Sequence, residues 1–233
     1  NHIPGAIFFD LDKNSDQDTD LPHMLPAKEK WEEIVSSMGI SNTDRIVIYD
    51  NSDVLSSCRG WYNFIYFGHD KHLVSVLNGG LKKWLIENRK TTSEKTILNN
   101  STYRATEDKN LVKSIHEINE NIEQKNFTII DARSKERFNG SVPDPRKNVR
   151  SGSIPNSVCL PFKEIINSSD NTFKDVSEIS KKFSEIIDLN DDKRVFSCGS
   201  GITACVLGLA YSLVNNTYSP TVYDGSWAEY GRI

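Results

Sequence analysis

The sequence predicts an α/β fold made of two tandem domains, each with a mainly parallel sheet flanked by helices. One observation is an internal repeat, because three motifs of the first half recur in the same order in the second. The paired segments are Ile3–Ile7 with Ile154–Val158, Ile46–Asp50 with Arg194–Cys198, and Val76–Gly80 with Val222–Ser226, at offsets of 151, 148 and 146 residues. A period this long indicates duplicated domains and not a solenoid. The other observation is that short β-rich runs alternate with helical patterns in each half, which is typical of parallel sheets.

The second half carries the clearest signals for individual elements. Phe127–Ala132 and Val195–Ser197 are compact apolar runs of the kind that form buried parallel strands. Between them, apolar residues at helical spacing predict an amphipathic helix over Val176–Ile187. Ala204–Val214 is apolar and rich in small residues, which predicts a helix packed on the sheet.

A polar segment, Lys90–Asn110, separates the two halves and has the composition of a linker. We therefore expect a first domain over residues 1–95, a linker over 96–108 and a second domain over 109–233. The first half has no counterpart of the strand at Phe127–Arg133, and the chain opens without Met. The second half also stops where the first continues a helix through Trp84–Asn88. Both ends are therefore expected to be truncated.

Composition argues against several classes of function. The 233 residues carry a net charge of −4 with scattered Lys and Arg, so neither nucleic acid nor a membrane surface is an expected partner. The longest apolar runs are too short to span a bilayer. Four cysteines without a C-x-x-C pair indicate neither a zinc site nor a disulfide framework. Because no disulfide framework is indicated, we expect the protein in a reducing compartment, which is the cytoplasm, or the mitochondrion if a targeting peptide is missing.

Cys198 opens a glycine-containing loop, Cys198–Thr203, between a predicted strand and a predicted helix. Ligands bind at the carboxyl ends of strands in open parallel sheets. The glycines let backbone amides face inward and the helix N-terminus adds positive potential, which together favour a reactive thiolate. Cys198 is therefore the expected nucleophile, and Thr203 is expected to cap the helix. Cys58, Cys159 and Cys205 are expected to be structural, with a resolving-thiol role for Cys205 as the weaker alternative.

The segment Cys198–Ala204 resembles the active-site loop of the tandem-domain rhodanese family, specifically the 3-mercaptopyruvate sulfurtransferase type. Further segments resemble the same family in the same order: Phe8–Asp12, Pro22–Pro26, Phe67–His69, Leu77–Gly80, Asp131–Gly140, Pro143–Arg146 and Tyr223–Trp227. The resemblance covers nearly the whole chain. It implies a catalytic second domain and a first domain without the cysteine, and Asp50 indeed stands where the second half has Cys198.

The resemblance also implies roles for individual side chains. Arg137 and Arg146 would grip the carboxylate and keto oxygen of the substrate, since guanidinium groups match planar carboxylates bidentately. Ser200, His23 and Asp12 would move protons at the substrate thiol. The remaining expected substrate-binding positions are Gly199, Gly201, Ile202 and Thr203. Arg133 is expected to pair structurally.

The predicted function is sulfur transfer from 3-mercaptopyruvate, through a Cys198 persulfide, to thioredoxin, a small thiol or cyanide. In thiosulfate-specific members of the family this loop resembles Cys-Arg-Lys-Gly, with two cations after the cysteine. The residues at those two positions here, Gly199 and Ser200, are neutral. Thiosulfate:cyanide sulfurtransferase is therefore the alternative, and a non-catalytic rhodanese-like binding module is a lesser one. A cysteine phosphatase would need Arg at position 204, which is Ala. No metal or organic cofactor is implied.

Overall fold

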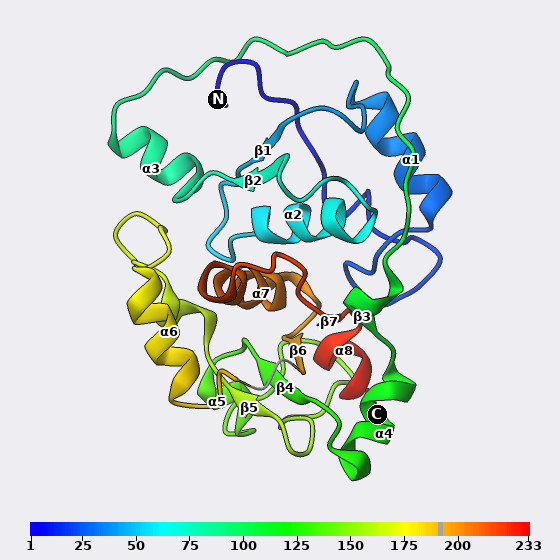
Figure 1. The fold of residues 1–233 in the computed structure, drawn as a ribbon, viewed down its shortest axis with the longest axis vertical. Helices are drawn as coiled ribbons and strands as arrows, with labels where there is room; N and C mark the ends of the chain where they lie inside the picture. The colour runs from blue at the N-terminus through cyan, green and yellow to red at the C-terminus, as the bar shows by residue number, and fades with distance from the viewer. Residues whose placement is uncertain (191–192) are drawn as a thin grey trace.

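The computed structural model describes residues 1–190 and 193–233, and it places the two halves of the chain one above the other (Figure 1). The second half contains a five-stranded parallel sheet in the order β3-β7-β6-β4-β5. Its strands are β3 (Val112–Lys113), β4 (Thr128–Asp131), β5 (Val158–Cys159), β6 (Arg194–Ser197) and β7 (Val222–Tyr223). Its helices are α4 (Ile115–Gln124), α5 (Lys135–Phe138), α6 (Val176–Ser184), α7 (Ile202–Asn215) and α8 (Ser226–Tyr230), with 3-10 turns η1 (Lys109–Leu111) and η2 (Phe162–Ile165).

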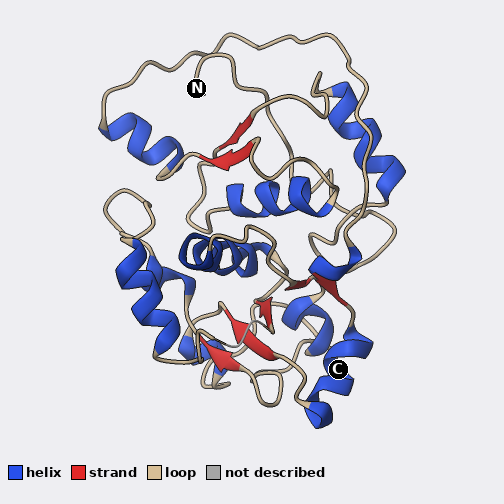
Figure 2. Ribbon diagram, viewed as in Figure 1, coloured by secondary structure: helices blue, strands red, loops and turns tan. Residues whose placement is uncertain are grey.

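The first half is smaller and more irregular (Figure 2). Its two strands, β1 (Ile46–Ile48) and β2 (Val74–Val76), pair in parallel. Its helices are α1 (Lys28–Ser37), α2 (Ser57–Tyr66) and α3 (Gly80–Ile86). The predicted α/β class, with parallel sheets flanked by helices, is confirmed in both halves.

The alternation of side chains along the strands divides the core of the second half into two layers. Ile130 of β4 and Phe196 of β6 belong to the large cluster that includes α7. Their neighbours Ile129 and Val195 lie in a second cluster, together with Trp227. Both faces of the sheet are therefore covered, as expected for a parallel sheet.

The two halves share one hydrophobic core. Helices α2 and α7 pack against each other between the sheets (Figure 1), and every residue of α2 is buried. The large core cluster accordingly includes residues of both halves, such as Trp61 and Leu207. Burial of apolar area stabilises by about 25 cal/mol per Å², so a continuous core holds the halves in one arrangement. This arrangement fixes any site formed where they meet.

The predicted elements of the second half are confirmed, with small shifts at their ends. The strand predicted at Phe127–Ala132 is β4, and the helix predicted at Ala204–Val214 is α7. The helix predicted over Val176–Ile187 ends earlier, at Ser184. Its last two apolar residues pack against the core from the turn that follows α6, so they continue the apolar pattern without continuing the helix.

The segment expected to be a linker has no helix or strand over 96–108, and it runs outside α1 towards β3 (Figure 1). It is not merely a solvated tether, because Tyr103 and Ala105 are buried. The amide of Ala105 donates to Glu32 at 2.8 Å, and the amide of Thr106 donates to the carbonyl of Phe67 at 2.9 Å. Residues 103–106 of the linker are therefore packed against and hydrogen-bonded to the first half of the chain. Within the two described ranges, no helix has the length and apolar character needed to cross a bilayer.

Candidate active site

The Cys198 loop joins the end of β6 to the start of α7. The Cys198 side chain is only 2% exposed, and the amide of Ser200 donates to its Sγ at 3.4 Å. The first amides of an α-helix have no intrahelical acceptors, so the start of α7 adds positive potential beside the sulfur. Gly201 takes a left-handed conformation with φ of 78°, and a Cβ there would lie 2.6 Å from Nη1 of Arg59. The loop therefore requires glycine at position 201.

The segment after β7 holds this loop in place from the other side. The Ser226 hydroxyl accepts hydrogen bonds from the amides of Cys198, at 3.1 Å, and Gly201, at 3.2 Å. It donates in turn to the carbonyl of Tyr223 at 2.8 Å, and the amide of Trp227 donates to the carbonyl of Cys198 at 3.0 Å. The motif Tyr223–Trp227 was predicted to accompany the site, but the bridging role of Ser226 was not.

The expectation that Thr203 caps the helix is wrong. The N-cap residue of α7 is Gly201, whose left-handed conformation starts the helix at Ile202 without a side-chain cap. Thr203 is thus the second residue of the helix, and it is half-buried on the first turn beside Ile202. The sequence pattern alone did not reveal that the helix begins before Thr203.

The three side chains expected to handle protons are brought together across the two halves. His23 Nδ1 lies 3.0 Å from the Ser200 hydroxyl, and His23 Nε2 lies 3.1 Å from a carboxylate oxygen of Asp12. An ionised carboxylate only accepts hydrogen bonds, so Nε2 carries the proton and Nδ1 of the neutral ring accepts from Ser200. The ring is half-buried, whereas the Asp12 side chain is 81% exposed.

The environment of His23 favours its neutral form. Burial lowers the pKa of His23 below its ordinary value, since a buried ring is charged less readily. The Asp12 carboxylate and the Ser200 contact oppose this shift, while the charges of Arg59 and Arg146 add to it. A neutral imidazole can take a proton from the Ser200 hydroxyl.

Arg137 and Arg146 lie together over the loop, half-buried, and share one carboxylate. Arg137 Nη2 is 2.6 Å from Asp144 Oδ2, and Arg146 Nη1 is 3.3 Å from Asp144 Oδ1. Burial would raise the pKa of Asp144, but hydrogen bonds from Arg137 and the Arg146 amide outweigh it, so that pKa is lowered. A Cβ at Gly199 would lie 3.2 Å from Arg146 and 3.3 Å from Arg137, so glycine allows this close approach. The orienting carboxylate was not singled out from the sequence, although it stands two residues before Arg146.

His23 has a left-handed backbone, with φ of 64°, which is uncommon for a residue with a side chain. Two buried groups hold the chain on either side of it. Arg59 Nη2 donates to the His23 carbonyl at 2.7 Å, and Asp224 accepts from the amide of Leu25 at 2.7 Å. Neither Arg59 nor Asp224 was predicted to take part in the site. The sequence signals were weak, since Arg59 is a single cation beside Cys58 and stands in no motif of the site.

The other three thiols lie in environments that oppose ionisation. Cys58 is fully buried, and burial raises its pKa well above the ordinary value. Burial also raises the pKa of Cys205 and of Cys159 to about 12. The Cys205 thiol donates to the Gly201 carbonyl at 3.1 Å, which favours the packing role over that of a resolving thiol. Arg133 pairs with Asp131 at 2.7 Å, both buried, as expected.

The fold and the site define a class of protein: an α/β protein with a cysteine-glycine loop between a central strand and a helix, under paired arginines. The rhodanese-like domain family matches this chain over residues 1–87 and 114–232. The chain therefore belongs to the rhodanese family and contains two domains of that type.

Named relatives support the same grouping. The chain is 39% identical to thiosulfate/3-mercaptopyruvate sulfurtransferase 1, mitochondrial, of Arabidopsis thaliana, over 98% of its own length and 65% of that protein's. It is also 39% identical to the 3-mercaptopyruvate sulfurtransferase of Homo sapiens, covering 98% and 76% of the two chains. The crystal structure of SseA from Escherichia coli, a 3-mercaptopyruvate sulfotransferase, superposes with a TM-score of 0.84 at 31% identity, covering 98% of this chain and 84% of SseA.

Proposed function

We propose that this protein transfers sulfur from 3-mercaptopyruvate, through a persulfide on Cys198, to a thiol acceptor or cyanide, with release of pyruvate. The observation that carries the proposal is the convergence of three groups on one loop. Cys198 begins the loop, two guanidinium groups approach Gly199, and His23 of the first domain hydrogen-bonds to Ser200. The relatives named above act on 3-mercaptopyruvate or thiosulfate by their names, which supports the same reaction type here.

In this proposal, Arg137 and Arg146 bind the carboxylate and keto oxygen of the donor. Their shared partner Asp144 neutralises only one of the two positive charges, so the pair keeps a net charge of +1 for an anionic donor. Guanidinium groups also stabilise the enolate that forms when pyruvate departs. Gly201, Ile202 and Thr203 supply the first turn of α7 beside the substrate.

The proposed chemistry is a nucleophilic attack by the Cys198 thiolate on the sulfur of mercaptopyruvate. The sulfur–sulfur bond forms as the carbon–sulfur bond breaks, and the electron pair moves to the carbon of the departing pyruvate enolate. Ser200 takes the proton of the substrate thiol and passes its own to His23, whose ring is oriented by Asp12. The proton then returns to the enolate carbon, leaving a Cys198 persulfide and pyruvate.

Donor choice follows from the charge of the loop. Gly199 and Ser200 are neutral, so a thiosulfate dianion would meet only the paired arginines and backbone dipoles. A thiol acid with one carboxylate matches the net charge of that pair. Thiosulfate remains the second candidate donor, because the name of the Arabidopsis relative includes both donors. A purely non-catalytic binding module is disfavoured by the retained cysteine.

We further propose thioredoxin or a small thiol as the acceptor, in a reducing compartment, either the cytoplasm or the mitochondrion. A persulfide is released by thiol attack, and this chemistry needs reduced thiols. The proposed domain boundaries stay at 1–95 and 109–233, with the linker at 96–108. The first domain then supplies His23 and Asp12, and the second supplies the cysteine loop and both arginines.

Steady-state kinetics with each donor and cyanide as acceptor test the proposal. Mercaptopyruvate is expected to give the higher kcat/KM, with pyruvate and thiocyanate formed in equal amounts. A higher kcat/KM for thiosulfate would instead favour the second candidate. Absence of thiocyanate with both donors would contradict sulfur transfer altogether.

A further inference from the structure

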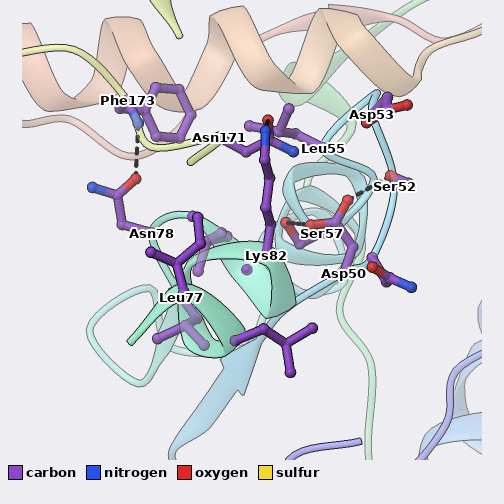
Figure 3. A pocket seen from close by; sticks show the side chains of 16 residues that line it. Asp50, Ser52, Asp53, Leu55, Ser57, Leu77, Asn78, Lys82, Asn171 and Phe173 are labelled. Atoms are coloured by element: carbon purple, nitrogen blue, oxygen red, sulfur yellow. Dashed lines mark hydrogen bonds between the residues drawn. The ribbon is translucent and has the colours of Figure 1, made fainter. Parts of the chain in front are cut away.

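A cavity of about 380 Å³, whose lining does not include Cys198, lies between the loop after β1 and the segment around Asn171 (Figure 3). Its size is within the range of small-molecule sites. The polar lining side chains are Asp50, Asn51, Ser52, Asp53, Ser57, Asn78, Lys82 and Asn171. Apolar side chains, including Leu55, Val76, Leu77 and Phe173, complete the wall.

This cavity occupies the place in the first domain that the active site occupies in the second. In the first domain the amide of Leu81 donates to the carbonyl of Asp50 at 3.0 Å. In the second, the amide of Trp227 donates to the carbonyl of Cys198, also at 3.0 Å. In both domains, therefore, the first turn of the helix that follows one strand (α3 after β2, α8 after β7) donates a hydrogen bond to the loop that follows the neighbouring strand (β1 or β6).

The contact between the domains is repeated as well. The amide of Phe173 donates to the side-chain oxygen of Asn78 at 2.8 Å (Figure 3). The amide of Leu25 donates to the carboxylate of Asp224 at 2.7 Å. Each domain thus extends a segment over the loop of the other.

Residues 23 and 171 also correspond, since both have a left-handed backbone, with φ of 64° for His23 and 60° for Asn171. The cavity is therefore the internal counterpart of the active site, with Asp50 in the position of Cys198. A carboxylate there cannot carry a persulfide, so the retained cavity calls for a different ligand chemistry.

Three charged side chains line the cavity, Asp50, Asp53 and Lys82, and none of them forms a salt bridge among the described residues, although the charge of Lys82 helps to lower the pKa of Asp170. The Asp50 carboxylate accepts hydrogen bonds from three hydroxyls, those of Ser52 at 2.5 Å, Ser57 at 3.1 Å and Ser56 at 3.3 Å, and from no cation among the described residues. Lys82 Nζ donates to the carbonyl of Ser168 at 2.7 Å and to Asn171 Oδ1 at 3.2 Å, which are both uncharged. An ammonium group has three donors, so one remains for a ligand.

We propose that this cavity binds a small zwitterion of the α-amino-acid class that carries an apolar side chain. The ligand's ammonium group pairs with Asp50 and its carboxylate pairs with Lys82. Its side chain lies against Leu77 and Phe173. A ligand with only one charge would leave either Asp50 or Lys82 without an ionic partner, whereas the exposed Asp53 stays solvated, so selection depends on the charges of Asp50 and Lys82.

Isothermal titration calorimetry with L-leucine, L-methionine and L-phenylalanine tests the proposal. At least one amino acid is expected to bind saturably with a stoichiometry of one. For L-leucine, the matched probes isoamylamine and 4-methylvalerate each lack one charge, and each is expected to bind about tenfold more weakly or worse, as for one lost charge-assisted contact. Equal affinity for a one-charge analogue, or no saturable binding by any of the three amino acids, would overturn the proposal.

Variants place the binding in this cavity. Asp50→Asn and Lys82→Met are each expected to weaken amino-acid binding about tenfold. Lys83→Met serves as the control, because Lys83 is on the same helix but pairs with Glu87 and Asp170 and does not line the cavity. Cys198→Ser should bind the amino acid unchanged. Loss of binding in Cys198→Ser would assign the ligand to the active site and refute the proposal, whatever the sulfurtransferase assay gives.

Discussion

Arg59 of the first domain and Asp224 of the second form an ion pair at 2.5 Å that is almost completely removed from solvent. The pair lies directly beneath the active site. Arg59 contacts the carbonyls of His23 and Gly201, and Asp224 accepts from the amide two residues after His23. One buried pair therefore fixes the loop that carries the cysteine and the segment that carries the imidazole. We infer that Arg59 is a positioning residue for His23.

Replacing Arg59 by Met is expected to destabilise the protein and to impair the reaction. Removing one partner of a buried ion pair leaves the Asp224 charge uncompensated, at a cost of about 3–5 kcal/mol in the free energy of unfolding. The matched control is Arg133→Met, which breaks the other buried pair, with Asp131, without touching His23. Both variants should lose comparable stability in urea unfolding. Arg59→Met alone should lower kcat for mercaptopyruvate beyond the loss seen in the control.

The pH profile separates positioning from stability. Arg59 contributes to the lowered pKa of His23, so Arg59→Met should move the acid limb of kcat/KM to higher pH. The Arg133→Met profile should keep its wild-type position. Arg59→Lys retains the charge and provides the folded protein if Arg59→Met does not fold. If its kcat equals that of the wild type, then the contacts made by the guanidinium group do not position His23.

Asp12→Asn is predicted to shift the same acid limb in the opposite direction. The neutral form of His23 is the active one, and its pKa is below the ordinary value of about 6.5, so activity should persist to lower pH than for a free imidazole. The Asp12 carboxylate raises that pKa, so its removal lowers it further. The shift should be small, because Asp12 is mostly exposed and its charge is screened. A shift to higher pH would contradict the assigned roles.

Cys198 is predicted to be the only thiol that accepts sulfur. Intact-mass measurement after exposure to mercaptopyruvate should show one added sulfur atom, removable by dithiothreitol or cyanide. Burial keeps Cys58, Cys159 and Cys205 protonated at neutral pH, so they should remain unmodified. Cys198→Ser should take up no sulfur. Peptide mapping that places the added mass on another cysteine would refute the assignment.

The sequence predicted the parts of the site that lie in local patterns. The strand, glycine loop and helix around Cys198 are contiguous, and Asp131 and Arg133 stand two residues apart. Arg137 and Arg146 were placed by family resemblance, and the structure brings both to Gly199. The start of α7 was missed because the sequence does not show that Gly201 takes the left-handed conformation from which the helix begins at Ile202.

Pairings between distant segments were not predictable in the same way. Arg59 and Asp224 are 165 positions apart, and the helical pattern around Arg59 gives no sign that its guanidinium group is fully buried. The segment around Tyr103 is polar overall, which indicated a solvated linker, yet its single large aromatic side chain is buried. In both cases the packing depends on the burial of one side chain, and the average composition of the segment does not predict that burial.

Arg137→Ala and Arg146→Ala are each predicted to lower kcat/KM for mercaptopyruvate. A lost hydrogen bond to a charged group costs about 1.5–3 kcal/mol, which corresponds to roughly ten- to a hundredfold. The loss of kcat/KM should exceed the loss of thermal stability, because the second arginine still pairs with the buried Asp144 carboxylate. Arg150→Ala is a suitable control, since Arg150 stacks on Trp227 and Tyr230 and makes no contact with Asp144 in the described residues. An unchanged kcat/KM at either position would remove that arginine from the substrate site.

The preference for mercaptopyruvate over thiosulfate is predicted to depend on position 199. Gly199→Arg adds a cation beside Cys198 and keeps Ser200, so the ratio of kcat/KM values should shift towards thiosulfate. Any side chain here also pushes on Arg137 and Arg146, because its Cβ would lie 3.2–3.3 Å from their guanidinium nitrogens. Gly199→Ala isolates that displacement, since it adds the Cβ without a charge. It should lower kcat/KM for both donors with little change in their ratio. If Gly199→Arg and Gly199→Ala give the same donor ratio, the charge of the loop does not select the donor, and the shape of the arginine pair would account for the preference instead.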